Sequence, residues 1–493
     1  MRRHPWLTAA IVLFVLCVGT FFAFEWHSEK RWQRYAAEAR AHGVKLMITD
    51  FMQPPITDNA NFASLPMLQK MFADPNAEIP LSLPRKKDAK QVTVGNFTST
   101  LDSLPKFGDP LKSQPIDWQQ WQQYFWEAGY LPEKSDDSVR DVLRALEHYA
   151  PEFQQWSEWR TRTQCRFPMD WSKAKMPSPH HFTVMRNAAK LFALRMRAHL
   201  ALHDSRAAYA DFQDGLQAYR ALRHEPTLID GLVRNSVLHI LFAAVGDGCK
   251  DHAWTDEDSG KIEADLASIQ AWDDCKFALA SERGHFNNTM ETWLRASMRE
   301  RGEMFSAYAD LGFEAPSKTQ LWVAGMYPRA MVRDNQYWQN RYFDELLGRI
   351  DTDRQTIHLD RATPSAIGPP TDSFDAFHYF PIRSSQGAYA EVERRYITLQ
   401  TMLDQTRLAC ALERFRAKHG AYPVALAELV PDFIAAAPND VYASAPYRYR
   451  RIGETSFQLY GVGKNRKDDG GFIAPRLPEN QQLDAIWLYA PSR

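Results

Sequence analysis

Cysteine is scarce in the 493-residue chain, and its five copies show no metal-binding spacing. Cys17, Cys165, Cys249, Cys275 and Cys410 form no C-x-x-C pair and no pattern with histidine, so a structural zinc site is not expected. At most a single disulfide is expected. Cys249 and Cys275 are the pair to test, because both are predicted near the ends of neighbouring helices.

Motifs of the common catalytic classes are also missing. The chain has no G-x-S-x-G, no P-loop, no G-x-G-x-x-G and no H-E-x-x-H. His180 and His181 stand in a Pro-Ser-Pro-His-His stretch and are not expected to bind a metal, and Glu147 with His148 is expected to be a surface pair. No catalytic residue is therefore assigned, and a protein without enzymatic activity is the favoured interpretation.

Neither sign of charge is in excess, since 59 Lys and Arg stand against 60 Asp and Glu. A nucleic-acid-binding protein would show a basic face or tail, so nucleic acid is not an expected partner. Hydrophobic residues make up 45% of the chain and aromatic residues 13%, which is typical of a folded protein. A chain of this length predicts two or three structural units.

A long uncharged run near the N-terminus predicts a membrane anchor. Residues 7–24, LTAAIVLFVLCVGTFFAF, would span about 27 Å as a helix, close to the hydrocarbon thickness of a bilayer. Trp6 and Trp26 bracket the run, as interfacial tryptophans do. A cleaved signal peptide is the alternative, although no convincing small-x-small cleavage site follows. We expect a single-pass protein of the bacterial inner (cytoplasmic) membrane, held by residues 7–24, with the bulk of the chain exported.

The body of the chain predicts a mainly α fold of stacked helical hairpins. Residues 182–270 give four helices of similar length, whose starts are marked by Asp204 or Ser205, by Pro226 and by Thr255. The tetratricopeptide signature is not met, so a loose hairpin stack is the expectation. The predicted segments are an anchor with a membrane-proximal helix, an irregular and helical region, the hairpin body, a proline-rich linker and a small α+β module, at residues 1–43, 44–180, 181–350, 351–386 and 387–493.

Arginine is concentrated between two tryptophans in residues 159–171, WRTRTQCRFPMDW. Arg160, Arg162 and Arg166 are candidates to line a pocket for an anionic ligand. The alternative is a loop that packs its aromatic residues while the arginines lie in solvent or pair with nearby acids.

The C-terminal segment predicts a long helix on a small antiparallel sheet. Residues 387–419 have a helical apolar stripe that ends at Gly420, and three short strands are expected at residues 447–449, 457–460 and 486–489. The order of helix, GAYP, LAELVPDFI, YRY, FQLYGVGKN and DDGG resembles the globular domain of the major pseudopilins of type II secretion.

That resemblance implies a calcium ion in the last loop. The positions that match its ligands are Asp468, Asp469 and Asp484. A glycine-rich acidic loop can surround a cation that takes several oxygen ligands. The alternative is a solvated turn without metal, because three basic residues of the same loop could neutralise the aspartates: Lys464, Arg466 and Lys467.

Over nearly its whole length the chain also resembles large membrane-anchored proteins of Planctomycetes and Verrucomicrobia. The phrases that carry this resemblance are PPITDNANF, EPTLIDGLV and ACALERFRAKHGAYP. It implies no activity.

Three functions therefore remain open. The favoured one is a membrane-anchored envelope scaffold with a protein partner, because hairpin stacks offer concave faces for extended partners. An accessory component of a type II-like secretion system is the second, and the missing pilin processing site argues against a filament subunit. The third is an exported hydrolase or ligand-binding protein with a cleft near Arg160 and Arg166.

Overall fold

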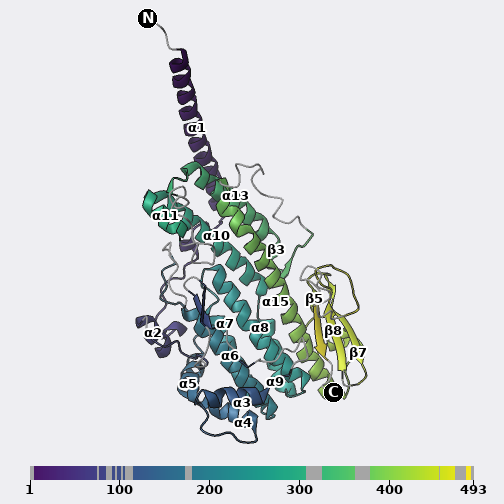
Figure 1. Cartoon of the computed structure of the whole chain (residues 1–493). Helices are drawn as coiled ribbons and strands as arrows, with labels where there is room; N and C mark the ends of the chain where they lie inside the picture. The colour runs from purple at the N-terminus through teal and green to yellow at the C-terminus, as the bar shows by residue number, and fades with distance from the viewer. Residues whose placement is uncertain are drawn as a thin grey trace.

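An elongated helical body dominates the computed structural model, with the first helix projecting from one end and a small sheet on one side (Figure 1). The predicted class, mainly α with an N-terminal apolar helix and a small C-terminal sheet, is confirmed. The structure describes residues 5–74, 77–84, 91–94, 97–100, 104–105, 115–171, 180–306, 325–360, 378–454, 456–471 and 485–489.

The first part of the chain forms α1 and then short helices around the far end of the body. The elements in this part are α1 (Pro5–Ala41), η1 (Ile48–Phe51), η2 (Phe62–Ser64), α2 (Pro66–Ala73), β1 (Gln91–Val94), β2 (Phe97–Thr100), α3 (Trp118–Glu127), α4 (Ser138–Leu146), η4 (Glu147–Tyr149) and α5 (Ala150–Trp159). β1 and β2 form an antiparallel hairpin.

Longer helices build the core. They are α6 (His180–Ala201), α7 (Ser205–Ala221), α8 (Leu228–Lys250), α9 (Asp256–Ala267), α10 (Ala271–Arg295), α11 (Met298–Ser306), α13 (Arg329–Gly348) and α15 (Phe380–His419). Helix α6 packs on α7 and α8, α10 packs on α13, and α15 lies along α8 and α9. One continuous hydrophobic cluster runs through most of these contacts.

Of the three helix starts predicted in the core, two, at Asp204 and Thr255, are confirmed by capping side chains. An Asp204 carboxylate oxygen accepts a hydrogen bond from the Ala207 amide at 3.0 Å, and Thr255 Oγ1 accepts one from Asp258 at 3.1 Å. The expected start at Pro226 is wrong. The side chain of Thr227 caps α8 instead, because its hydroxyl can accept the amide hydrogen bond that the proline ring cannot.

Helix α15 begins earlier than predicted, at Phe380, and ends as predicted at Gly420, whose φ of 80° is a left-handed value that glycine adopts without strain. Leu408 and Leu412 on its apolar stripe are fully buried in the same cluster as the core helices. The helix that opens the predicted C-terminal module is thus part of the core of the body. The division into five segments stays a prediction, and residues 361–377 of the linker lie outside the described part.

The predicted strands of the terminal sheet are confirmed as β7 (Arg448–Ile452), β8 (Ser456–Gly461) and β9 (Ala485–Tyr489), antiparallel and in that order. Two-residue strands add two small hairpins, β3 (Ile350–Asp351) with β4 (Thr356–Ile357) and β5 (Asn439–Asp440) with β6 (Ala445–Pro446). The single-turn η7 (Leu426–Leu429) lies between α15 and the sheet in sequence. β8 packs against α15 through its buried residues Phe457 and Leu459.

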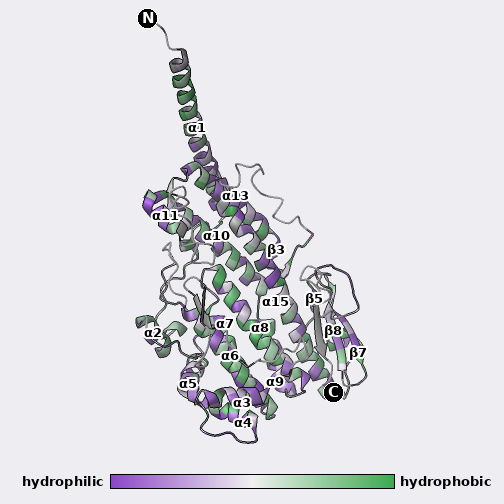
Figure 2. Cartoon of the chain, viewed as in Figure 1, coloured by the Kyte–Doolittle hydropathy of each residue, from purple (hydrophilic) through white to green (hydrophobic). Residues whose placement is uncertain are grey.

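Two described helices are long and apolar enough to cross a membrane, Thr8–Ala41 and α8. Helix α8 is mostly buried inside the body, so it is a core helix. The apolar part of α1 is exposed, with Phe14 at 69%, and it projects beyond the body as a hydrophobic rod (Figure 2). By length and composition α1 could be a single membrane anchor or a signal sequence.

Candidate functional site

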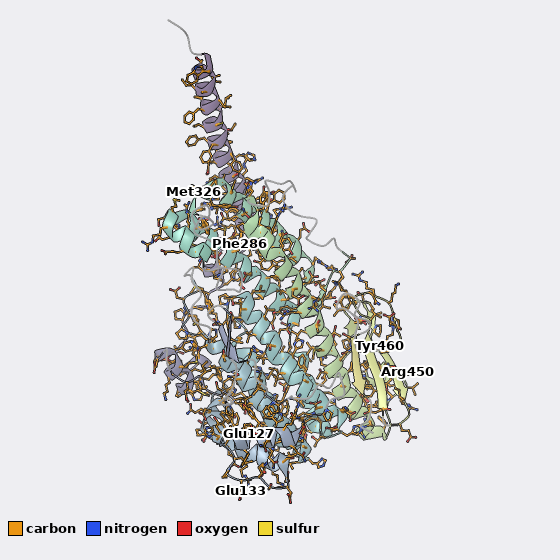
Figure 3. The ribbon with its side chains drawn as sticks, in the orientation of Figure 1. Glu127, Glu133, Phe286, Met326, Arg450 and Tyr460 are labelled. Carbon is orange, nitrogen blue, oxygen red and sulfur yellow. The ribbon has the colours of Figure 1, made fainter. Side chains whose placement is uncertain are left out.

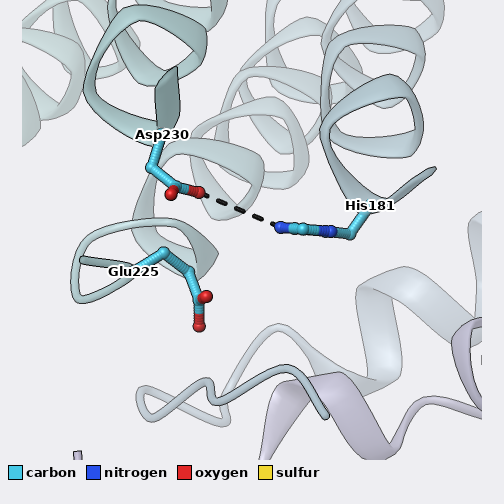
Figure 4. A group of neighbouring side chains, drawn as sticks. All are labelled: His181, Glu225 and Asp230. Atoms are coloured by element: carbon cyan, nitrogen blue, oxygen red, sulfur yellow. Dashed lines mark ion pairs between the residues drawn. The ribbon is translucent and has the colours of Figure 1, made fainter. Parts of the chain in front are cut away.

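Three buried ionisable side chains meet where α6 and α8 begin (Figure 4). His181 lies in the first turn of α6, Asp230 in the first turn of α8, and Glu225 in the loop between α7 and α8. One potential ligand atom from each lies within 4.8 Å of the other two. His181 and Asp230 are 0% exposed and Glu225 is 4% exposed. We name these three residues the His-Glu-Asp cluster.

Local sequence explains how the two carboxylates come together. Thr227 caps α8. Its Oγ1 accepts a hydrogen bond from the Asp230 amide at 3.2 Å, and its hydroxyl donates one to Asp230 Oδ2. Glu225 stands just before the cap, and Trp171 Nε1 donates to its Oε2 at 2.8 Å. The Phe167 amide donates weakly to Glu225 Oε1 at 3.4 Å. Each carboxylate is therefore held by one oxygen, and its other oxygen has a weak partner or none among the described residues.

The histidine side has no hydrogen bond to a described residue. Neither ring nitrogen of His181 has such a partner, nor does Asp230 Oδ1. His181 Nε2 and Asp230 Oδ1 face each other at 3.9 Å, which is too long for a hydrogen bond. A buried polar atom without a partner costs about 1–3 kcal/mol, so three in one place are unusual in a native core.

Aromatic rings surround the imidazole and keep it away from water. Its ring centroid lies 4.6 Å from that of Phe167 and 4.1 Å from that of Phe182. Burial lowers the pKa of His181 to about 3 and raises that of Glu225 to about 7. Burial and the neighbouring Glu225 also raise the pKa of Asp230. At neutral pH the imidazole is therefore uncharged.

Sequence reasoning missed the His-Glu-Asp cluster. His181 lies in a Pro-Ser-Pro-His-His stretch without a zinc motif, which gave no reason to expect a carboxylate beside it. Glu225 and Asp230 both lie in the phrase EPTLID, and the Thr227 cap was the available signal that they share one helix start. The pairing with α6 is a tertiary contact that this local pattern does not contain.

The three predicted anion-binding arginines have different partners. Arg160 pairs with Asp214 at 3.0 Å. Arg162 lies over the Trp159 ring at 3.3 Å and donates to the Asp58 carbonyl at 2.6 Å.

Arg166 lines a small space of about 10 Å³ against Glu225. A cavity of about 280 Å³ is lined by Asp58, Asn59, Ser64, Gln69, Trp159 and Arg162. Of the predicted arginines, Arg162 alone is among its lining residues, and a shared anion pocket stays a prediction.

The predicted calcium loop is described only in part, because Asp484 lies outside the described residues. Both oxygens of Asp468 accept hydrogen bonds, from Tyr460 and the Gly470 amide on one and from Arg448 on the other, at 3.0–3.1 Å. Asn465 donates to Asp469 at 2.7 Å. The hydrogen bond from Gly470 and the nearby Arg448 guanidinium hold the pKa of Asp468 below its usual value. Calcium binding at this loop stays a prediction.

Cys249 and Cys275, the pair named for testing, do not form a disulfide in the structure. All five cysteines lie in the described part of the chain, and none of them forms a disulfide. The sulfur atom that faces Cys249 belongs to Cys410 of α15, at 4.0 Å. The prediction used helix ends close in sequence, whereas the packing of α15 on α8 brings a distant cysteine closer.

Comparisons with known proteins assign no relationship: no family model, no curated protein and no solved structure matches the chain.

Proposed function

We propose that the protein is an exported, membrane-anchored scaffold that presents a rigid helical body to a protein partner at the bacterial inner membrane. The observation that carries this proposal is the continuity of α1. One 37-residue helix, Pro5–Ala41, provides both the exposed apolar rod and a segment packed into the body. The anchor and the body are therefore joined without a flexible linker.

Contacts of the second half of α1 support an anchor that is retained. Trp32, Ala36 and Ala39 are buried together with Leu46 in a hydrophobic cluster. The ring of Phe24, the last residue of the apolar run, lies 5.7 Å from that of His378. Helical structure continues through the point where a signal peptide would be cut, which favours an anchor over a cleaved leader.

Ion pairs fix the direction in which α1 leaves the body. Arg31 pairs with Asp334 of α13, and Arg333 of the same helix pairs with Glu29 at 2.8 Å. Tyr35 donates to Asp344 at 2.9 Å. These contacts hold the body at a set angle to the rod, as a scaffold requires.

Burial of the His-Glu-Asp cluster supports a function without catalysis. A substrate must reach its catalytic groups, and these three side chains are at most 4% exposed. Their arrangement suits a structural role better than turnover.

Site-specific photo-crosslinking in intact cells tests the scaffold proposal. Glu127 and Glu133 lie at the end of the body far from the rod, and Arg450 lies on the sheet (Figure 3). All three are exposed and can carry a crosslinking residue. We expect one discrete protein adduct from at least one of these faces. No adduct from any of them, in cells where the protein is shown to reside in the membrane fraction, would contradict the proposal.

Two alternatives are tested in the same cells. A ligand-binding role has one specific observation in its favour, the cavity of about 280 Å³ beside Trp159 and Arg162. The ligand-binding role predicts that Arg162→Ala abolishes ligand binding while the crosslinks to a protein partner persist. An accessory role in type II-like secretion rests on the resemblance of the terminal sheet and its loop, and it predicts that the crosslinked partner is a secretion component.

A further inference from the structure

The unsatisfied atoms of the His-Glu-Asp cluster belong to His181 and Asp230. His181 Nε2 and Asp230 Oδ1 face each other at 3.9 Å, and Glu225 lies below Asp230 in the view, with a carboxylate oxygen within 4.8 Å of both (Figure 4). The Thr227 hydroxyl donates to Oδ2 of Asp230 and the Trp171 indole to Oε2 of Glu225, and these bonds leave Asp230 Oδ1 without a partner among the described residues. Metal-binding carboxylates are oriented by hydrogen bonds of this kind.

Charge balance also fits a divalent cation. A bound metal displaces the protons of its ligands, and a neutral imidazole with two deprotonated carboxylates then sums to a charge of about −2, which one divalent ion would cancel inside an apolar shell. Arg234, the nearest buried cation on α8, is paired with Asp274 at 3.1 Å. The other titratable groups near the cluster are His180, His224, Arg166 and Cys165.

Ligand number and type distinguish among the divalent ions. Calcium takes six to eight oxygen ligands, more than two carboxylates and an imidazole supply. Zinc takes nitrogen and oxygen ligands in a tetrahedral arrangement, and the three side chains supply three of its four positions.

We propose that His181, Glu225 and Asp230 bind one zinc ion, which joins the starts of α6 and α8 to the loop before α8. Zinc ligands at about 2.1 Å from the metal lie roughly 3.4 Å apart, so the cluster must contract by about 1 Å. The site is structural, because solvent does not reach it. The metal enters while the chain folds. This proposal is independent of the scaffold function.

Metal content of the purified full-length protein is the first test. The chain is produced in medium containing Zn²⁺, Mn²⁺ or Ca²⁺, isolated in detergent without chelator, and analysed by mass spectrometry for metals. We expect about one zinc per chain, with calcium near background. The variants His181→Gln, Glu225→Gln and Asp230→Asn should each lower the zinc content or affinity at least about 10-fold.

A matched control uses another buried carboxylate that faces a histidine. His252 lies 2.9 Å from Glu413, and among the described residues no third His, Cys, Asp or Glu side chain completes a possible metal site with them. His252→Gln should keep about one zinc per chain. Equal loss in this control, or zinc retained in all three cluster variants, would place the metal elsewhere and overturn the proposal.

Thermal unfolding covers the case in which a cluster variant folds poorly. In the wild-type chain, stripping with a strong chelator should lower the Tm by several degrees, and Zn²⁺ should restore it. Any folded cluster variant should unfold at one Tm whether or not zinc is present. A wild-type protein with substoichiometric zinc and a Tm that is insensitive to chelator and to added Zn²⁺ would refute the site.

Discussion

The two terminal elements of the chain are attached to the helical body by different chemistry. At one end, α1 is held mainly by charged pairs, such as Arg31 with Asp334, beside one hydrogen bond from Tyr35 to Asp344. At the other, Tyr447, which directly precedes the first strand of the terminal sheet, donates to Asp404 of α15 at 3.1 Å. A carboxylate opposite an arginine stays ionised, whereas a carboxylate opposite a phenol in an apolar place favours its proton.

The pKa values reflect this difference. Burial raises the pKa of Asp334, but hydrogen bonds from His378, Ser28 and Arg31 outweigh it and the pKa is lowered. Burial dominates at Asp404 and raises its pKa to about 7. The Arg31–Asp334 pair is therefore insensitive to pH near neutrality, and the hydrogen bond between Tyr447 and Asp404 is sensitive to it.

Removing the carboxylate from the α1 interface should have the largest effect. Asp334→Ala leaves Arg31 and His378 facing each other without their shared partner. We expect the free energy of unfolding to fall by about 3 kcal/mol. Thermal or denaturant unfolding of the full chain in detergent measures it. Glu303→Ala is the control, because its pair with Arg299 is exposed and should change stability by less than about 0.5 kcal/mol. Equal effects of the two substitutions on the free energy of unfolding would contradict a role for Asp334 in holding α1 to the body.

The pH dependence of stability tests the sheet attachment. Because Asp404 binds its proton more tightly in the folded state, its contribution to stability is lost as pH rises from about 4 to about 7. Asp404→Asn keeps an acceptor for Tyr447 and removes the titration. As pH rises from about 5 to about 7.5, the free energy of unfolding of the variant should increase by about 2 kcal/mol relative to that of the wild type. A difference that does not change with pH would show that Asp404 is ionised in the folded protein.

The hydrogen bond itself should contribute less than the titration. Tyr447→Phe removes the donor to Asp404 at a buried position and should cost about 1 kcal/mol of unfolding free energy. A double-mutant cycle with Asp404→Asn measures the coupling between the two side chains. Additive effects would mean that the sheet is held by apolar packing alone.

The last prediction concerns the cysteines, for which no covalent link is expected. Peptide mapping of the unreduced protein should find no link between Cys249 and Cys275, since Cys249 faces Cys410. A Cys249–Cys275 peptide recovered at high yield would contradict the packing of α15 on α8.

Much of the fold could be predicted from local signals. Thr255 marked the start of α9 and Gly420 the end of α15, because a cap and a left-handed glycine act on neighbouring backbone. The strands around Phe457 followed from alternation of buried and exposed residues. The His-Glu-Asp cluster and the Cys249–Cys410 contact could not be predicted in this way, because each depends on which helices pack together, and this is set by the whole core.

Helix α1 also fixes a rotational phase. Its backbone is unbroken from the apolar rod to the segment packed on α13, so twisting the rod turns the body by the same angle. Each residue of an α-helix advances the chain by about 100° around the axis. A single residue inserted between the rod and Glu29 would therefore turn the body by roughly a quarter turn relative to the rod. The length of α1 thus sets which face of the body is aligned with a given face of the rod.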